Sequence, residues 1–104
     1  MSTDNLHIPQ DRLADFCTRW KITELALFGS VLRDDFGPDS DIDILVTFEQ
    51  GARITLLRFA AAQRELSTLL DRSVDLVMRR AVEASARQSR SAHILESAEV
   101  VYAA

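Results

Sequence analysis

Residues 27–46 read LFGSVLRDDFGPDSDIDILV, a run that contains a tight turn and the clearest strand of the chain. Its second half opens a segment, Asp41 to Phe48, in which apolar side chains recur at every second residue, as is typical of a strand. One face of that strand would carry Ile42, Ile44, Val46 and Phe48. The opposite face begins with Asp41 and Asp43, and carboxylates there are costly if the face is buried. The pattern therefore indicates a function for these two aspartates.

A glycine and a serine end the preceding segment, Ile22 to Phe28, which is also predicted to be a strand. Gly29 lets the backbone approach a phosphate closely, and a short helical turn through Arg33 would offer free N–H groups to an anion. The Ser30 hydroxyl adds a further donor. The turn chemistry of residues 34–40 predicts a loop. A Gly-Ser pair alone is common in turns, but here it is joined to Asp-x-Asp across ten intervening residues.

A third carboxylate, Asp75, lies in the predicted strand Ser73 to Met78, on the face opposite Val74, Leu76 and Met78. If this strand neighbours the first, three carboxylates converge and each resists being charged. A divalent cation removes that conflict. Oxygen ligands suit Mg²⁺ or Mn²⁺, and two such ions can stabilise an in-line phosphoryl displacement. Alternatively, Asp75 forms a structural ion pair with Arg72 or Arg79.

The remaining elements predict helices packed against one sheet. Pro9 fits the first turn of a helix to about Trp20, in which Cys17 belongs to the core-facing stripe and serves in packing. A second helix from Ile54 to Leu70 offers the core Leu57, Ala60, Ala61, Leu66, Leu69 and Leu70. A polar helix at 80–90, a short helix at 93–97 and an edge strand at 100–102 follow. The order α-β-α-β-α-β predicts an α/β (α+β) fold with a small sheet flanked by helices.

Length and composition indicate one domain over residues 1–104. We expect the protein to be cytoplasmic. The net charge of −4 argues against a protein that coats nucleic acid without sequence preference, because such a protein would be basic overall. The lone Cys17 cannot form an internal disulfide, and no apolar run approaches the ~20 residues that span a membrane. The aspartates are not an EF-hand loop, because Ile44 and Gln50 replace its required Gly and Glu. There is no Gly-Lys-Ser/Thr sequence, so the chain is not a P-loop protein.

Gly29-Ser30 and Asp41-Ile-Asp43 resemble the signature of the DNA polymerase beta-like nucleotidyltransferase superfamily. The fuller runs at 27–33 and 39–46 are similar to its minimal nucleotidyltransferase branch. The resemblance covers most of the chain, since Val74-Asp-Leu-Val77 and the ending at 94–102 are similar too. One departure is Asp34, which stands where many relatives have glycine.

The resemblance implies the nucleotidyltransferase fold with a mixed sheet. It also implies a role for each residue of the motif. Gly29 and Ser30 would hold the triphosphate. Asp41 and Asp43 would ligate both metal ions, and Asp75 would complete the catalytic metal site as a further ligand and help to deprotonate the attacking hydroxyl. Two further residues are candidates for nucleotide binding. The first is Ser40, which could instead only brace the loop. The second is Arg33, which could instead form a salt bridge to a neighbouring aspartate.

Minimal members of the family are commonly encoded beside HEPN-domain ribonucleases and neutralise them as antitoxins. The resemblance therefore implies Mg²⁺-dependent transfer of AMP, from ATP as substrate, to a tyrosine hydroxyl of a HEPN toxin. The resemblance implies two Mg²⁺ ions, with Mn²⁺ as an alternative. We expect a hetero-oligomer with the toxin, and we expect neither membrane contact nor direct binding of nucleic acid. Two alternatives stay open. One is a binding module that masks the toxin without catalysis, and the other is transfer to a small-molecule acceptor.

Overall fold

The computed structural model describes residues 8–29, 41–84 and 94–104. Its elements, in chain order, are α1 (Gln10–Trp20), β1 (Ile22–Phe28), β2 (Ile42–Phe48), α2 (Leu56–Leu70), β3 (Val74–Met78), α3 (Arg79–Ala84) and β4 (Glu99–Ala103). A helical turn at 94–97 precedes β4. The predicted strands and the first two helices are confirmed, with ends shifted by one or two residues. The predicted turn through Arg33, the loop 34–40 and the end of the helix predicted at 80–90 lie outside the described residues.

Four strands form one mixed sheet in the order β3-β2-β1-β4. β1 runs antiparallel to both β2 and β4, whereas β2 and β3 are parallel. A parallel pair needs a long crossover, and α2 supplies it. The predicted mixed sheet flanked by helices is confirmed. The described elements follow one another as α-β-β-α-β-α-β, and residues 30–40 between β1 and β2 lie outside the described residues.

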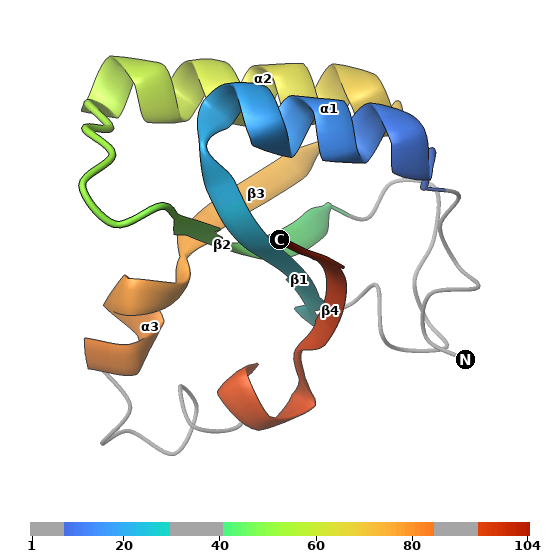
Figure 1. The fold of residues 1–104 in the computed structure, drawn as a ribbon. Helices are drawn as coiled ribbons and strands as arrows, with labels where there is room; N and C mark the ends of the chain where they lie inside the picture. The colour runs from blue at the N-terminus through green and yellow to red at the C-terminus, as the bar shows by residue number, and fades with distance from the viewer. Residues whose placement is uncertain (1–7, 30–40, 85–93) are drawn as a thin grey trace.

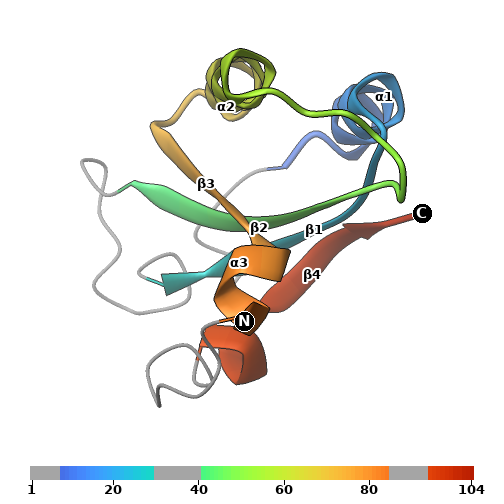
Figure 2. The ribbon, with the colours of Figure 1, turned by 90° about the vertical axis from the view of Figure 1, so that its left-hand side faces the viewer.

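The larger core lies between the sheet and the pair of helices α1 and α2, which cover the same face (Figures 1 and 2). Alternation in β2 sends Ile42, Ile44 and Val46 to this face, as predicted. Cys17 is fully buried there, and burial raises the pKa of its thiol to about 12. A thiol with so high a pKa is unreactive at neutral pH. The predicted packing role of Cys17 is confirmed.

α1 and α2 are also joined by polar contacts at their outer edges. The Trp20 indole N–H donates to Glu65 Oε1 at 3.1 Å, and the Arg19 guanidinium donates to the other oxygen of the same carboxylate. The hydrogen bond from Arg19 is the main cause that lowers the pKa of Glu65. The Arg58 guanidinium lies 5.5 Å from the centroid of the Trp20 ring. These contacts hold the helical layer together while its apolar side chains pack on the sheet.

The opposite face of the sheet carries a smaller core of three buried residues, Ala26, Phe28 and Leu45. Side chains from α3 and from the turn at 94–97 pack against it, and Figure 2 shows α3 on the side of the sheet away from α1 and α2. Asp43 lies two residues before Leu45, so it belongs to this face. The thinly covered face is therefore the one that carries the candidate aspartates.

The prediction that Leu57 joins the core is wrong, because its side chain is 83% exposed. The buried residues of α2 are Ala62, Leu66 and Leu70. Leu57 lies nine residues before Leu66, and at about 100° per residue this places it on the opposite side of the helix from Leu66. Thr55 caps the helix by accepting from the Arg58 N–H, which places Leu57 in the first turn. None of the helices within the described ranges is long and apolar enough to cross a lipid bilayer.

Candidate active site

The parallel register of β2 and β3 sets Asp43 directly beside Asp75. Neighbouring strands lie roughly 4.8 Å apart, so these residues are adjacent on the sheet. Both lie on the face of the smaller core, since Val77, two residues after Asp75, packs there. Asp43 is partly buried and Asp75 is exposed. Asp41 lies just before β2 and is exposed. It is two residues before Asp43, which places it on the same face.

Hydrogen bonds on both sides of β3 hold this register. Towards β2, the Ile42 N–H donates to the Ser73 carbonyl at 2.8 Å. Towards α2, the Leu76 N–H donates to Gln63 Oε1 at 2.9 Å, and the Val74 N–H donates to Ser67 Oγ at 3.1 Å. The two residues that flank Asp75 are therefore anchored to α2. This role of Gln63 and Ser67 was not predicted from the sequence, although two polar residues four apart on a core helix were a signal.

Gly29 packs directly against Asp43. Its φ is +76°, a left-handed conformation, and a Cβ added there would lie only 2.3 Å from Asp43 Oδ2. β1 reaches this position because Phe28 is paired with Asp43 across the β1–β2 ladder. The sequence predicted that Gly29 makes room for a phosphate. What the structure shows is that Gly29 makes room for the carboxylate of Asp43; its role towards phosphate stays a prediction.

Asp75 forms no ion pair among the residues that the structure describes. Arg79, one of its two predicted structural partners, instead contacts Glu24 and Glu83, each at 3.2 Å. The structural ion pair between Asp75 and Arg79 is therefore not found. Asp75 keeps its carboxylate open to solvent on the aspartate face.

The remaining predicted site residues, Ser30, Arg33 and Ser40, lie outside the described residues. Within the described ranges, no three His, Cys, Asp or Glu side chains gather closely enough to hold a metal ion. Like charges resist close approach, so adjacent backbone positions need not bring carboxylates into contact. The structure places Asp43 and Asp75 at neighbouring positions of the sheet, and Asp41 lies two residues before Asp43. This oxygen-only set of side chains is of the kind that Mg²⁺ or Mn²⁺ prefers.

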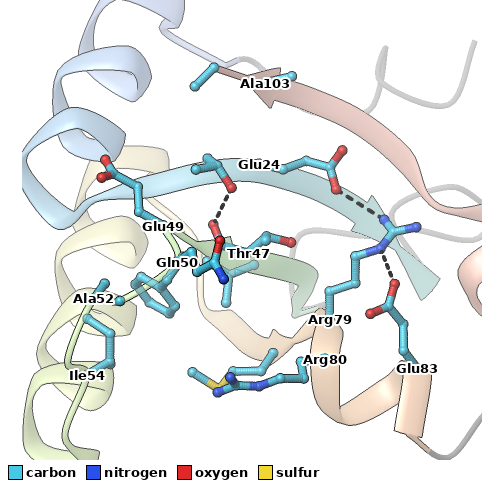
Figure 3. Close-up of a pocket in the computed structure, with 16 residues that line it drawn as sticks. Glu24, Thr47, Glu49, Gln50, Ala52, Ile54, Arg79, Arg80, Glu83 and Ala103 are labelled. Carbon is cyan, nitrogen blue, oxygen red and sulfur yellow. Dashed lines mark hydrogen bonds and ion pairs between the residues drawn. The ribbon is translucent and has the colours of Figure 1, made fainter.

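A large cavity of about 630 Å³ lies at the other end of the strands (Figure 3). It is lined by the ends of β2 and β3, by residues 49–52 and 54, and by the start of α3. Thr47, which lines the cavity, is four residues from Asp43, or about 13 Å along a strand. In the cavity, Arg79 pairs with Glu24 and Glu83.

Residues 12–101 match the family model described as a nucleotidyltransferase domain. The chain is 43% identical over 61 residues to the protein adenylyltransferase MntA of Thermococcus cleftensis, an alignment over 59% of this chain and 60% of MntA. The chain thus spans about three fifths of the length of that curated relative.

Two solved structures share the fold. A structure described as a minimal nucleotidyltransferase superposes with a TM-score of 0.64 and 32% identity, covering 86% of this chain and 85% of that one. A crystal structure of a toxin-antitoxin with AMP-PNP gives a TM-score of 0.56 and 25% identity, over 70% of this chain and 59% of that one.

Proposed function

The chain belongs to the nucleotidyltransferase domain family, and from this premise we propose that it is the antitoxin of a toxin–antitoxin pair. Its reaction would be the transfer of AMP from ATP to a tyrosine hydroxyl of a HEPN-domain ribonuclease toxin. The observation that supports this most is the adjacency of Asp43 and Asp75 beside Gly29. The relative named a protein adenylyltransferase and the toxin-antitoxin structure with AMP-PNP support the same activity. The pair would assemble as a hetero-oligomer in the cytoplasm.

In this proposal Asp41, Asp43 and Asp75 hold two Mg²⁺ ions. Bound Mg²⁺ would neutralise negative charge on the phosphates and stabilise the oxygens of the displacement. The N–H groups around Gly29 and Ser30 bind the triphosphate, with Arg33 and Ser40 as further contacts.

The proton and bond changes are those of an in-line displacement. The acceptor oxygen attacks the α-phosphorus and forms a new P–O bond, while the bond to the β-phosphate oxygen breaks and pyrophosphate leaves. Asp75 accepts the proton of the acceptor hydroxyl. Its exposure is consistent with this role, because a hydroxyl on another protein must reach the carboxylate from solvent.

The experiment combines the chain, a HEPN-domain ribonuclease as the candidate toxin, Mg²⁺ and ATP labelled at the α-phosphate. We expect label on a tyrosine of the HEPN protein. Asp43→Asn and Asp75→Asn should each reduce the transfer rate by about 100-fold or more. Asp11→Asn, an exposed aspartate on α1, is the matched control and should transfer at the wild-type rate. Absence of label with the wild-type chain, or undiminished labelling with Asp43→Asn, would contradict the proposal.

A second candidate is masking of the toxin without catalysis, and the exposed leucines at the start of α2 favour a binding role. Cells that express the toxin separate the two. If masking is sufficient, the doubly substituted chain Asp41→Asn/Asp43→Asn still protects the cells. If transfer is required, this variant folds and binds the toxin but fails to protect. Transfer to a small-molecule acceptor would instead leave the HEPN protein unlabelled.

A further inference from the structure

β3 is an edge strand of the sheet, and its outer side is bonded to side chains of α2. The Val74 N–H donates to Ser67 Oγ at 3.1 Å, and the Leu76 N–H donates to Gln63 Oε1 at 2.9 Å. The residue between these two donors is Asp75. The candidate carboxylate on β3 is therefore enclosed by two anchor points to the helix.

The spacing of the two acceptors on α2 matches the spacing of the two donors on β3. Four residues along a helix rise about 6 Å, and two residues along a strand advance about 6.6 Å. Gln63 precedes Ser67 in the chain but binds the later of the two donors, so the elements run in opposite directions along the contact. α2 therefore bonds β3 as a neighbouring strand would, with two side chains in place of a backbone.

Apolar packing alone would define the position of β3 less well. Val74 and Leu76 are buried in the larger core, together with Leu66 and Leu70 of α2. Apolar contacts are non-directional, so they determine which face of β3 is buried but only loosely its position along the helix. Hydrogen bonds are directional, and these two join β3 to α2 immediately before and after Asp75.

Asp75 depends on such support more than Asp43 does. Asp43 lies on β2, a central strand paired on both sides, and packs against Gly29. Asp75 lies on the edge strand and is exposed. Mg²⁺ demands near-ideal octahedral geometry, with ligands at about 2.0–2.1 Å. A small shift of β3 would therefore be enough to take the Asp75 carboxylate away from an ion held at Asp43.

We propose that Gln63 and Ser67 are positioning residues, which hold Asp75 at the place where it completes the metal site with Asp43. The inference deepens the proposed function, because it rests on the assignment of Asp75 as a metal ligand. Both side chains act through the backbone of β3, on the side of the strand away from β2. Their loss should therefore alter metal binding without removing a contact to the nucleotide.

Calorimetric titration of the chain with Mn²⁺ and a non-hydrolysable ATP analogue tests this without any transfer reaction. Gln63→Met and Ser67→Ala should each weaken the metal-dependent binding by about tenfold or more, as is typical when a group that orients a metal ligand is removed. Gln63→Glu keeps an acceptor at the same distance from the helix and should recover most of the affinity. Binding of the analogue in the presence of a chelator should be the same for the wild type and all variants.

α2 offers a matched control for each variant. Arg64→Met changes an exposed side chain next to Gln63. Thr68→Val removes a hydroxyl next to Ser67, and that hydroxyl donates to the Arg64 carbonyl of its own helix and not to β3. Both controls should bind the analogue with Mn²⁺ as the wild type does.

A cycle of double variants shows whether Gln63 acts through Asp75. Asp75→Asn/Gln63→Met should bind metal and analogue no more weakly than Asp75→Asn, because the ligand that Gln63 positions is already lost. A general loss of stability would instead weaken binding by the same factor whether or not Asp75 is present.

The positioning role would be overturned by wild-type metal affinity in either Gln63→Met or Ser67→Ala, by an equal further loss in the Asp75→Asn background, or by a wild-type chain without metal-dependent binding. The proposed function fails separately, through the absence of label on the HEPN protein. Loss of metal affinity in the two variants without any AMP transfer would support positioning and contradict the function. Wild-type transfer by both variants, with Asp75→Asn inactive, would support the function and contradict positioning.

Discussion

At the scale of single residues, the contact between Gly29 and Asp43 leads to a testable difference between two glycines. Gly29→Ala and Gly51→Ala both place a Cβ at a positive φ, +76° and +88°. Each should therefore lose about 1–2 kcal/mol of unfolding free energy in urea denaturation. Only at Gly29 would the new Cβ meet a carboxylate, since nothing lies within 4 Å at Gly51. We expect Gly29→Ala alone to weaken Mg²⁺–ATP binding, measured by calorimetry. If both variants lost Mg²⁺–ATP affinity to a similar extent, backbone strain and not the contact with the carboxylate would be responsible.

Residue types and spacing were enough to single out Gly29, Asp43 and Asp75, but not to predict how they touch. The contact between Gly29 and Asp43 depends on the register of β1 on β2, and chain spacing alone does not define a register. The hydrogen bond from Leu76 to Gln63 depends on the rotation of α2 over β3. Ser30, Arg33 and Ser40 stay predictions from the sequence.

At the scale of elements, the outer edge of β3 is protected by α2, and this can be tested through Gln63. Gln63→Met keeps the length of the side chain but removes the acceptor of the Leu76 N–H. A partly buried donor left unpaired costs about 1–3 kcal/mol. Urea denaturation should show a loss of this size. Arg64→Met, an exposed position next in α2, is the control and should change stability by less than about 0.5 kcal/mol. Equal stability of the two variants would mean that water replaces Gln63 as acceptor.

The bounds and faces of the strands could be predicted because alternation encodes them directly. Ile42, Ile44 and Val46 point to the large core as the pattern predicts, and Asp75 shares the face of Val77. The neighbours of each strand could not be predicted, because alternation says which face is buried and not which edge is paired. The wrong prediction for Leu57 has a similar cause. Apolar composition identified α2, but the phase of its buried stripe was set by contact with the sheet.

At the scale of the whole molecule, the two sides of the sheet are unequal. The large core packs α1 and α2 against one face, and the aspartate face has a small core of three buried residues. α3, which helps to cover that face, contains no buried residue of its own. Little apolar surface therefore holds α3 in place. The weakly held side of the molecule is the one that carries Asp43 and Asp75.

Native-state hydrogen exchange tests whether this inequality of packing is an inequality of stability. Amides of α3 should exchange through local openings whose free energy lies well below that of global unfolding and depends little on urea. Amides of α1, with Leu13, Phe16 and Cys17 buried, should exchange only through larger openings. Equal opening free energies in the two helices would show that the smaller core is sufficient to fix α3, and that the aspartate face is as rigid as the helical layer opposite.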